Sequence, residues 1–180
     1  MISFSDSNDN SLNKDDFLIP TYVKKSSIPE AGDGRFFSND CKAGTIIRVQ
    51  SIEKDLTKIN SIDDISVIDE KLIDNFAHSK TITNDCNTSN IVYINKKPLF
   101  TNHSNDNNIT FQYINDQKIT YTTKHVKKDD EIFQNYCEYT KVPWFEEYLH
   151  SKGKYSLREF GMELKKKIYR HRKFTIIMIN

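Results

Sequence analysis

The chain has 180 residues, of which 37% are hydrophobic and 12% aromatic, so it can form one folded domain with a core and a short appendage. Its formal net charge of +1 excludes an overall field that would direct it to nucleic acid or to a membrane surface. The cysteines Cys41, Cys86 and Cys137 lie far apart without a CxxC spacing, which argues against a disulfide framework and against a cysteine-rich zinc site.

Neither export nor membrane insertion is indicated by the sequence. Residues 1–10 have no basic region and no apolar run of the kind found in a secretory signal. The longest apolar run, 176–179, is far shorter than the roughly 20 residues that span a bilayer. We therefore expect an intracellular protein in a reducing compartment, and the sequence does not decide between nucleus and cytoplasm.

The N-terminal third predicts short strands joined by tight turns. Residues 1–16 are rich in Ser, Asn and Asp and are expected to form a flexible tail. Strand-like residues follow over 17–27, then a Pro and Gly turn over 29–34, and a strand resumes at Phe36. A second turn at 42–44 precedes a β-branched strand over 45–52.

The middle of the chain changes from a helical to a strand pattern. Apolar residues recur at three- and four-residue spacing over 62–76, which predicts a helix. Residues 81–90 read as a polar loop, and 91–94 as a short strand. Residues 109–113 and 118–123 alternate in period two around Asn115-Asp116, which predicts a hairpin, and 131–133 is a last short strand.

The C-terminal segment is expected to be helical. Pro143 suits the first position of a helix, and Lys152-Gly153 ends it. Ser156 and Glu159 form a capping box that opens a second helix. The apolar stripe of this helix is Leu157, Phe160, Leu164 and Ile168. The expected organisation is a tail over 1–16, a domain over 17–140 with an insert at about 53–90, and a helical segment over 141–180.

Three polar fragments stand out, and each has a simple structural explanation when taken alone. Gly32-Asp33-Gly34 is usually a tight turn, although two glycines also let a backbone approach a ligand closely. Asn102-His103-Ser104 can be a polar loop, and no second metal-binding side chain stands near His103 at a metal-site spacing, so we expect no metal. Tyr136 can be a core tyrosine, or a phenol directed at a reacting group.

In this order and spacing, the fragments resemble the SET-domain protein lysine methyltransferases. The similarity covers about 22–139 and includes a variable insert before the second motif. The segments that carry it are 27–37, 42–47, 102–108 (an Asn-His-Ser motif) and 129–136 (an acidic motif that ends in Asn-Tyr). The resemblance implies a mainly β fold with some α (α+β), made of small curved sheets with a knot-like crossing (a pseudoknot), a helical insert and a helical tail.

The resemblance also implies an activity and a site. The activity is methyl transfer from S-adenosylmethionine to a lysine side chain of a protein substrate, for example a histone tail. Tyr136 is the implied catalytic tyrosine. The implied cofactor-binding residues are Ala31, Gly32, Asp33, Gly34, Asn102, His103 (through its main chain), Tyr136 and Trp144, with Phe145 as an alternative for stacking on the adenine. Phe100, Gln134 and Tyr139 are the implied residues of the substrate channel.

This chemistry suits the residue types, because the methyl donor is an activated sulfonium and the hard step belongs to the cofactor. The protein must supply a neutral amine, although free lysine has a pKa of about 10.4. A narrow apolar channel and the adjacent sulfonium both disfavour the ammonium form. Aligning two bound reactants can contribute roughly 7–11 kcal/mol. No nucleophilic side chain is needed.

Departures from the family pattern keep two other hypotheses open. Asn105 and Asn107 replace the usual Cys and Pro, Leu99 replaces a frequent Arg, and Gln134 stands where a Phe or Tyr often tunes the number of methyl groups. A SET-like interaction module without catalysis is therefore one alternative. The other is a nucleic-acid-binding protein that uses the basic cluster at 165–173, although a solvated helix face explains that cluster more simply. The sequence predicts neither the methylation state nor the oligomeric state.

Overall fold

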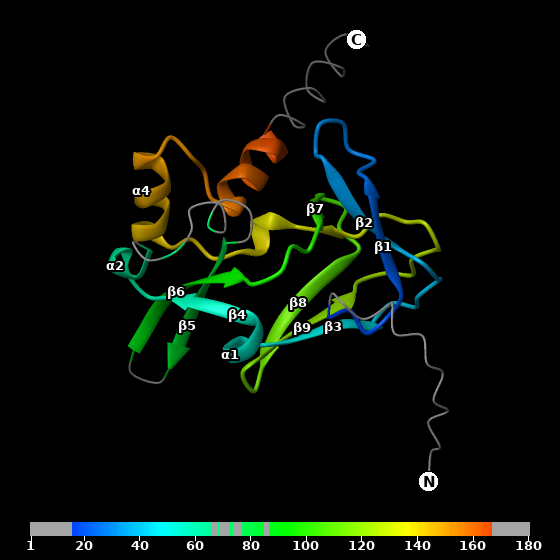
Figure 1. Cartoon of the computed structure of the whole chain (residues 1–180), viewed down its shortest axis with the longest axis horizontal. Helices are drawn as coiled ribbons and strands as arrows, with labels where there is room; N and C mark the ends of the chain where they lie inside the picture. The colour runs from blue at the N-terminus through cyan, green and yellow to red at the C-terminus, as the bar shows by residue number, and fades with distance from the viewer. Residues whose placement is uncertain (1–15, 66–67, 69–72, 74–76, 85–86, 167–180) are drawn as a thin grey trace, which may run out of the picture.

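The structure of the chain, a computed structural model, describes residues 16–65, 68, 73, 77–84 and 87–166. It contains three small sheets with short helices packed around them (Figure 1). The expected tail, apart from Asp16, and most of the basic cluster at 165–173 lie outside the described residues. Within the described part, no helix is long and apolar enough to cross a membrane.

The central sheet has five strands and contains both motif segments. Its order is β3 (Ile46–Ser51), β9 (Gln117–Thr122), β8 (Ile109–Ile114), β10 (Phe133–Gln134) and β7 (Asn102–His103). The first three strands pair antiparallel, whereas β10 runs parallel to both β7 and β8. The expected β-rich α+β class is confirmed, and the closing motif lies beside the Asn-His-Ser motif as expected.

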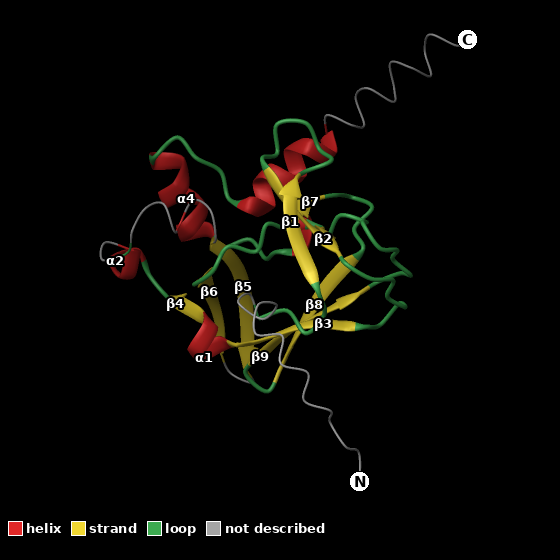
Figure 2. Cartoon of the chain, turned by 45° about the vertical axis from the view of Figure 1, so that its right-hand side comes forward, coloured by secondary structure: helices red, strands yellow, loops and turns green. Residues whose placement is uncertain are grey.

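A smaller sheet lies on each side of the central one in both views (Figures 1 and 2). On one side, β1 (Thr21–Lys25) pairs antiparallel with β2 (Asp33–Phe37). On the other side, β4 (Leu56–Ile59), β6 (Asn87–Asn95) and β5 (Ala77–Asn84) form a three-stranded sheet. The insert also carries two single-turn helices, α1 (Ile52–Asp55) and α2 (Ile62–Ile65).

One part of the insert corrects the sequence interpretation. The prediction of a polar loop over 81–90 is wrong, because β5 and β6 pair continuously from Ala77 with Ile94 to Asn84 with Asn87. Thr and Ile recur in this stretch, and β-branched residues favour strands even when the composition is polar. Of the helix predicted over 62–76, α2 and Ile73 are helical, and most of the residues between them lie outside the described part.

The helical segment after the domain follows the sequence prediction closely. α4 (Pro143–Ser151) begins with Pro143 in its first turn, and the chain turns at Gly153 with φ of 69°. Residues 157–166 form the next helix, which we call the 157–166 helix. The amide of Glu159 donates to Ser156 Oγ at 3.2 Å, and the amide of Ser156 donates to Glu159 Oε2 at 3.0 Å, which confirms the capping box.

Two apolar clusters hold these layers together. The first joins the outer faces of β2 and β3 to β8 through Phe17, Phe37, Ile47, Ile109, Val126 and Ile132. The second packs α4 on the three-stranded sheet through Ile59, Ile65, Ile73, Val92, Ile94, Val142, Phe145 and Leu149. The site described below lies between these two clusters.

The β8–β9 hairpin confirms the turn predicted at Asn115-Asp116. Both residues have positive φ, 46° and 58°, which is the signature of a type I′ turn. This turn matches the right-handed twist of the two strands, and Asn and Asp tolerate the left-handed region better than most residues.

We expect Asp116→Gly to stabilise the protein by about 0.5 kcal/mol, because glycine has no side-chain penalty at positive φ. The greater flexibility of glycine in the unfolded chain offsets part of this stabilisation. Asp116→Val should destabilise it, since a β-branched residue is strained there. Thermal unfolding of both variants measures the difference. Equal midpoints for the two would contradict the turn assignment.

Candidate functional site

The carboxylate of Glu131 joins three segments that are far apart in the sequence. It accepts hydrogen bonds from Ser26 Oγ (2.7 Å), the Ser27 amide (2.7 Å), Ser27 Oγ (2.6 Å) and Asn102 Nδ2 (2.9 Å). Burial alone would raise the pKa of Glu131, but the hydrogen bonds from Ser27, Asn102 and Ser26 outweigh it and lower the pKa below its usual value. The side chain is therefore a structural anion that fixes the 26–34 loop against β7.

Each of the two glycines in the 26–34 loop is favoured at its position for a different structural reason. Gly34 has no room for a side chain, because a Cβ atom would collide with the carboxylate of Glu131. Gly32 adopts a φ of 77°, which favours glycine, and its carbonyl accepts from the Ser26 amide at 3.0 Å. At Gly34 the backbone thus approaches Glu131 closely, while Ala31 and Asp33 line cavities.

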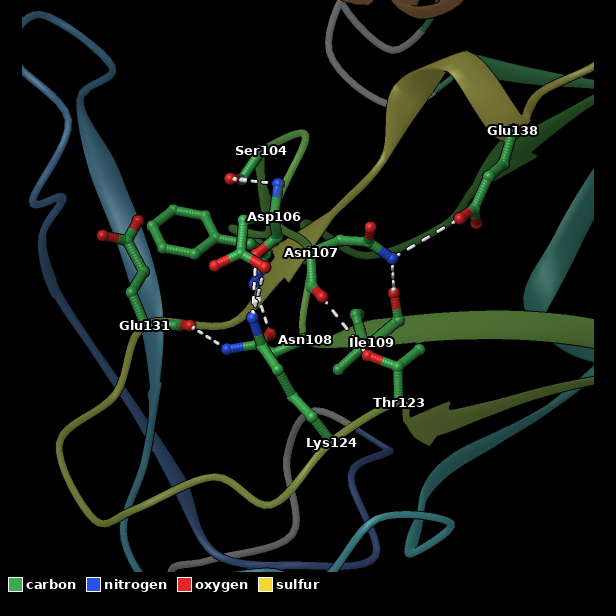
Figure 3. Close-up of polar contacts among 10 residues, drawn as sticks. Ser104, Asp106, Asn107, Asn108, Ile109, Thr123, Lys124, Glu131 and Glu138 are labelled. Atoms are coloured by element: carbon green, nitrogen blue, oxygen red, sulfur yellow. Dashed lines mark hydrogen bonds and ion pairs between the residues drawn. The ribbon is translucent and has the colours of Figure 1, made fainter.

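The loop after β7 is held by asparagine side chains (Figure 3). Asn108 is buried; its Nδ2 donates to the Glu131 carbonyl at 2.7 Å, and its Oδ1 accepts from the Phe133 amide at 2.9 Å. Asn107 Nδ2 donates to the Ile109 carbonyl at 2.9 Å and contacts Glu138 Oε1 at 3.4 Å. Asn107, one of the departures from the family pattern, therefore stabilises the loop by hydrogen bonds, and Asn105 is exposed.

His103 and Tyr136 bring the two motifs into direct contact. The Tyr136 amide donates to His103 Nδ1 at 3.0 Å, and the two ring centroids are 5.2 Å apart. Since Nδ1 accepts, the ring proton is assigned to Nε2. Burial lowers the pKa of His103, so the ring is neutral. Among the described residues, Nε2 has no hydrogen-bond partner although it is buried.

The Tyr136 hydroxyl is fixed by one main-chain acceptor. It donates to the Thr101 carbonyl at 2.7 Å, which leaves the lone pairs of its oxygen available to accept. Burial raises the pKa of Tyr136 to about 12, so the phenol stays protonated at neutral pH. Tyr136 can therefore orient a donor such as an amine, and it cannot act as a phenolate base there.

The residues expected to line a substrate channel lie close to Tyr136. Gln134 Nε2 donates to the Tyr139 hydroxyl at 2.8 Å, and both residues are buried. The Tyr139 ring lies 6.1 Å from that of Tyr136. Phe100 is partly exposed and has a positive φ of 54°, and its carbonyl accepts from the Arg35 amide at 2.8 Å.

Two cavities, each of about 490 Å³, lie next to Tyr136. We call the first cavity A; it is lined by Ala31, Asp33, Asn95, Pro98, Leu99, Phe100, Thr101, Asn102, Tyr136, Tyr139 and Leu157. We call the second cavity B; it is lined by Ile28, Pro29, Glu30, Ala31, Asn102, His103, Tyr136, Phe160 and Leu164. Ala31, Asn102 and Tyr136 line both, so a ligand in one cavity lies next to a ligand in the other.

The 157–166 helix forms a wall of both cavities. Leu157 lines cavity A, and Phe160 and Leu164 line cavity B, so three residues of the apolar stripe predicted on this helix border the cavities. A Cβ atom on Gly161 would lie 3.0 Å from Tyr136 Cβ and 3.3 Å from His103 Cε1. A glycine inside a helix was a signal of such close packing.

Trp144, expected to stack on the adenine, is not among the residues that line cavity A or cavity B. It packs against the apolar cluster between α4 and the three-stranded sheet and makes an edge contact with Phe145, with ring centroids 5.8 Å apart. Besides His103 and Tyr136, the aromatic ring of Phe160 lines cavity B, and Phe160 is 51% exposed. The Trp144 indole is partly buried, and the packing of α4 on the three-stranded sheet holds it against this cluster.

Within the described part of the chain, no group of three or more His, Cys, Asp or Glu side chains could hold a metal ion. Cys41 and Cys137 are free thiols.

We expect Glu131→Gln to destabilise the protein by about 3 kcal/mol, because an amide nitrogen would face buried donors and leave them unsatisfied. In the wild type, the stability that ionised Glu131 contributes should be lost as the pH falls from the usual glutamate pKa of about 4.3 to below the lowered pKa of Glu131. The stability of the variant should not show this decrease. Urea unfolding between pH 3 and 7 measures both effects. Glu138→Gln, which alters an exposed glutamate on the same segment, should change stability by less than about 1 kcal/mol.

Comparison with known proteins gives structural matches only. No protein-family profile matches the sequence, and no curated protein matches it. A humanized mutant of the Polycomb Repressive Complex 2 of Chaetomium thermophilum, solved with an inhibitor bound, has a TM-score of 0.50 at 20% identity. The match covers 73% of this chain and 16% of that much longer chain.

Two smaller proteins also match. A candidate histone methyltransferase of Plasmodium falciparum has a TM-score of 0.40 at 24% identity, with 69% of this chain and 96% of that chain covered. CpSET8 from Cryptosporidium has a TM-score of 0.48 at 12% identity, with 69% and 60% covered. At 20% identity the similarity to the Chaetomium thermophilum protein concerns the fold alone, and the chain has a SET-like fold, as the sequence resemblance predicted.

Proposed function

We propose that the chain transfers a methyl group from S-adenosylmethionine to a lysine side chain of a protein. The observation that carries this proposal is the meeting of cavities A and B at Tyr136, because methyl transfer needs a donor and an acceptor on the two sides of one aligned contact. The proposed domain is 17–140, and the proposed role of 141–180 is to close the cofactor site.

Cavity B is the proposed cofactor site. Its volume lies in the range of small-molecule sites, and its lining is mostly apolar with a few polar groups. The buried Nε2 of His103, which has no partner among the described residues, supports a ligand acceptor in this cavity. Asn102 and Ala31 would hold the amino acid part near Tyr136, and Phe160 would contact the adenine. The cofactor supplies an activated methyl group as a sulfonium.

Cavity A is the proposed site of the target lysine. Tyr139 and Phe100 give it aromatic walls, which exclude water around an entering aliphatic side chain. The Tyr136 oxygen accepts a hydrogen bond from the amine and directs the nitrogen lone pair toward cavity B. Gln134 holds Tyr139 in place through its hydrogen bond. A histone tail is the first protein substrate to test.

We expect Phe160→Ala to weaken binding of S-adenosylhomocysteine about tenfold or more, because stacking of a base on an aromatic ring contributes roughly 1–3 kcal/mol. Trp144→Ala should lower stability and leave the affinity of the folded protein unchanged, since the partly buried indole packs against the apolar cluster under α4 and lines neither cavity. Calorimetric titration of both variants decides between the two aromatic residues. A loss of affinity in Trp144→Ala alone would reverse the assignment.

We expect Tyr136→Phe to reduce methyl transfer by about 100-fold or more while cofactor affinity changes little, because the hydroxyl that accepts from the amine and donates to the Thr101 carbonyl is lost and the ring is kept. The assay is transfer of a labelled methyl group to core histones, followed by mass spectrometry of the acceptor. Tyr155→Phe, at a residue 69% exposed, is the matched control and should keep wild-type activity. Cofactor binding by the wild type without transfer to histones or to lysate proteins would instead support a non-catalytic interaction module.

A further inference from the structure

A small internal cavity under the central sheet has polar walls to which the proposed reaction assigns no role. Its volume is about 10 Å³, and it is lined by Phe17, Arg48, Gln50, Leu99, Thr101, Ile109, Lys118, Thr120 and Gln134. Arg48 and Gln50 lie two residues apart on β3, so their side chains project from the same face of the sheet. Arg48 is 3% exposed and Gln50 is fully buried.

These two side chains bring complementary polar atoms to the cavity. Arg48 Nε and Nη1 are donors and Gln50 Oε1 is an acceptor, and none of the three has a hydrogen-bond partner among the described residues. The two side chains therefore do not bond each other directly. Arg48 Nη2 lies 3.6 Å from the carboxylate of Asp16. Leaving a buried donor or acceptor unpaired is costly, and more so when the group is charged.

We propose that this cavity binds one water molecule, which accepts a hydrogen bond from Arg48 and donates one to Gln50 Oε1. A polar cavity of roughly 10–15 Å³ is large enough for one water. Water suits this pair of side chains, because the same molecule pairs a donor on one side and an acceptor on the other. The site does not depend on the proposed function.

A bound anion such as chloride fits this lining less well. It would accept from Arg48, which burial leaves with a pKa of about 10 and therefore charged at neutral pH, but it would be repelled by the oxygen of Gln50. Burial, together with the charge of Arg48, lowers the pKa of Lys118 to about 7, so this amine adds only part of a positive charge at neutral pH. The acceptor atom of Gln50 thus favours water over an anion.

One amide connects the water to the wall of cavity A. Gln50 Nε2 donates to Asn95 Oδ1 at 3.0 Å, and both residues are buried. Asn95 is the last residue of β6 and lines cavity A. With the water on Oε1 and Asn95 on Nε2, both ends of the Gln50 amide are held in one orientation. The water therefore helps to fix a polar residue of cavity A, which Leu99 and Thr101 separate from the small cavity by lining both.

The test is a high-resolution crystal structure of the full chain. The expected result is one oxygen peak at about 2.7–3.2 Å from Gln50 Oε1 and from Arg48 Nε or Nη1. A cavity without a peak, or side chains that have closed on each other so that Arg48 bonds Gln50 directly, would overturn the proposal. A crystal soaked in bromide checks the occupant, and an anomalous peak in the cavity would identify an anion site instead of a water site.

Two variants separate the polarity of the cavity from its size. Gln50→Met keeps a similar side-chain volume and removes the acceptor, so the water peak should fall to about half of its wild-type occupancy or less. If this variant does not fold, Gln50→Leu gives the same comparison. Ile109→Val enlarges the cavity by one methylene group and keeps both polar partners, so the peak should remain. A full peak in the folded Gln50 variant contradicts the bridge.

A measurement in solution needs no crystal. In the wild type, the Arg48 Nε hydrogen should show a nuclear Overhauser effect to a long-lived water, because the group is buried away from bulk solvent. This effect should be retained in Ile109→Val and weakened in Gln50→Met. Its absence in the folded wild type, or equal strength in all three proteins, would overturn the proposed water site.

Discussion

The carboxylate of Glu131 is the interaction on which the rest of the site depends. It is one buried anion whose hydrogen bonds reach the 26–34 loop and Asn102 of β7, while the backbone beside it bonds to Asn108. Its position leaves no room for a Cβ atom on Gly34. Removing one partner of such a network leaves the others buried and unpaired, so the segments that line both cavities depend on this single side chain.

The need for such an anion follows from the topology. β7 and β10 have two residues each and lie next to each other as parallel strands, so their ladder can form only a few main-chain bonds. Side chains supply what the short strands lack: Asn108 pairs with the backbone on both sides of Ile132, and His103 accepts from the Tyr136 amide. The residues that make up the motifs are therefore structural as well as chemical, which explains why the motifs are polar inside a strand-rich region.

Sequence reasoning succeeded where structure is decided locally and failed where it depends on distant partners. The Asn115-Asp116 turn, the Pro143 helix start and the Ser156 capping box each need only a few neighbouring residues, and all three are confirmed. The β5–β6 hairpin was missed because polar composition hides a backbone ladder. Phe160 was not considered beside Trp144 and Phe145, because its place in the lining of cavity B follows from how the 157–166 helix packs on distant segments.

Some buried residues on the inner face of the central sheet are not the ones that would make the fold most stable. Arg48, Gln50 and Lys118 are almost fully buried there, while the clusters on either side are apolar. Among the described residues, Arg48 Nε and Nη1 and Gln50 Oε1 have no hydrogen-bond partner. Apolar residues of similar volume would be at least as stable at these positions. These three side chains share the lining of a small internal cavity with Leu99 and Thr101, which also line cavity A, so the polar face adjoins the candidate site.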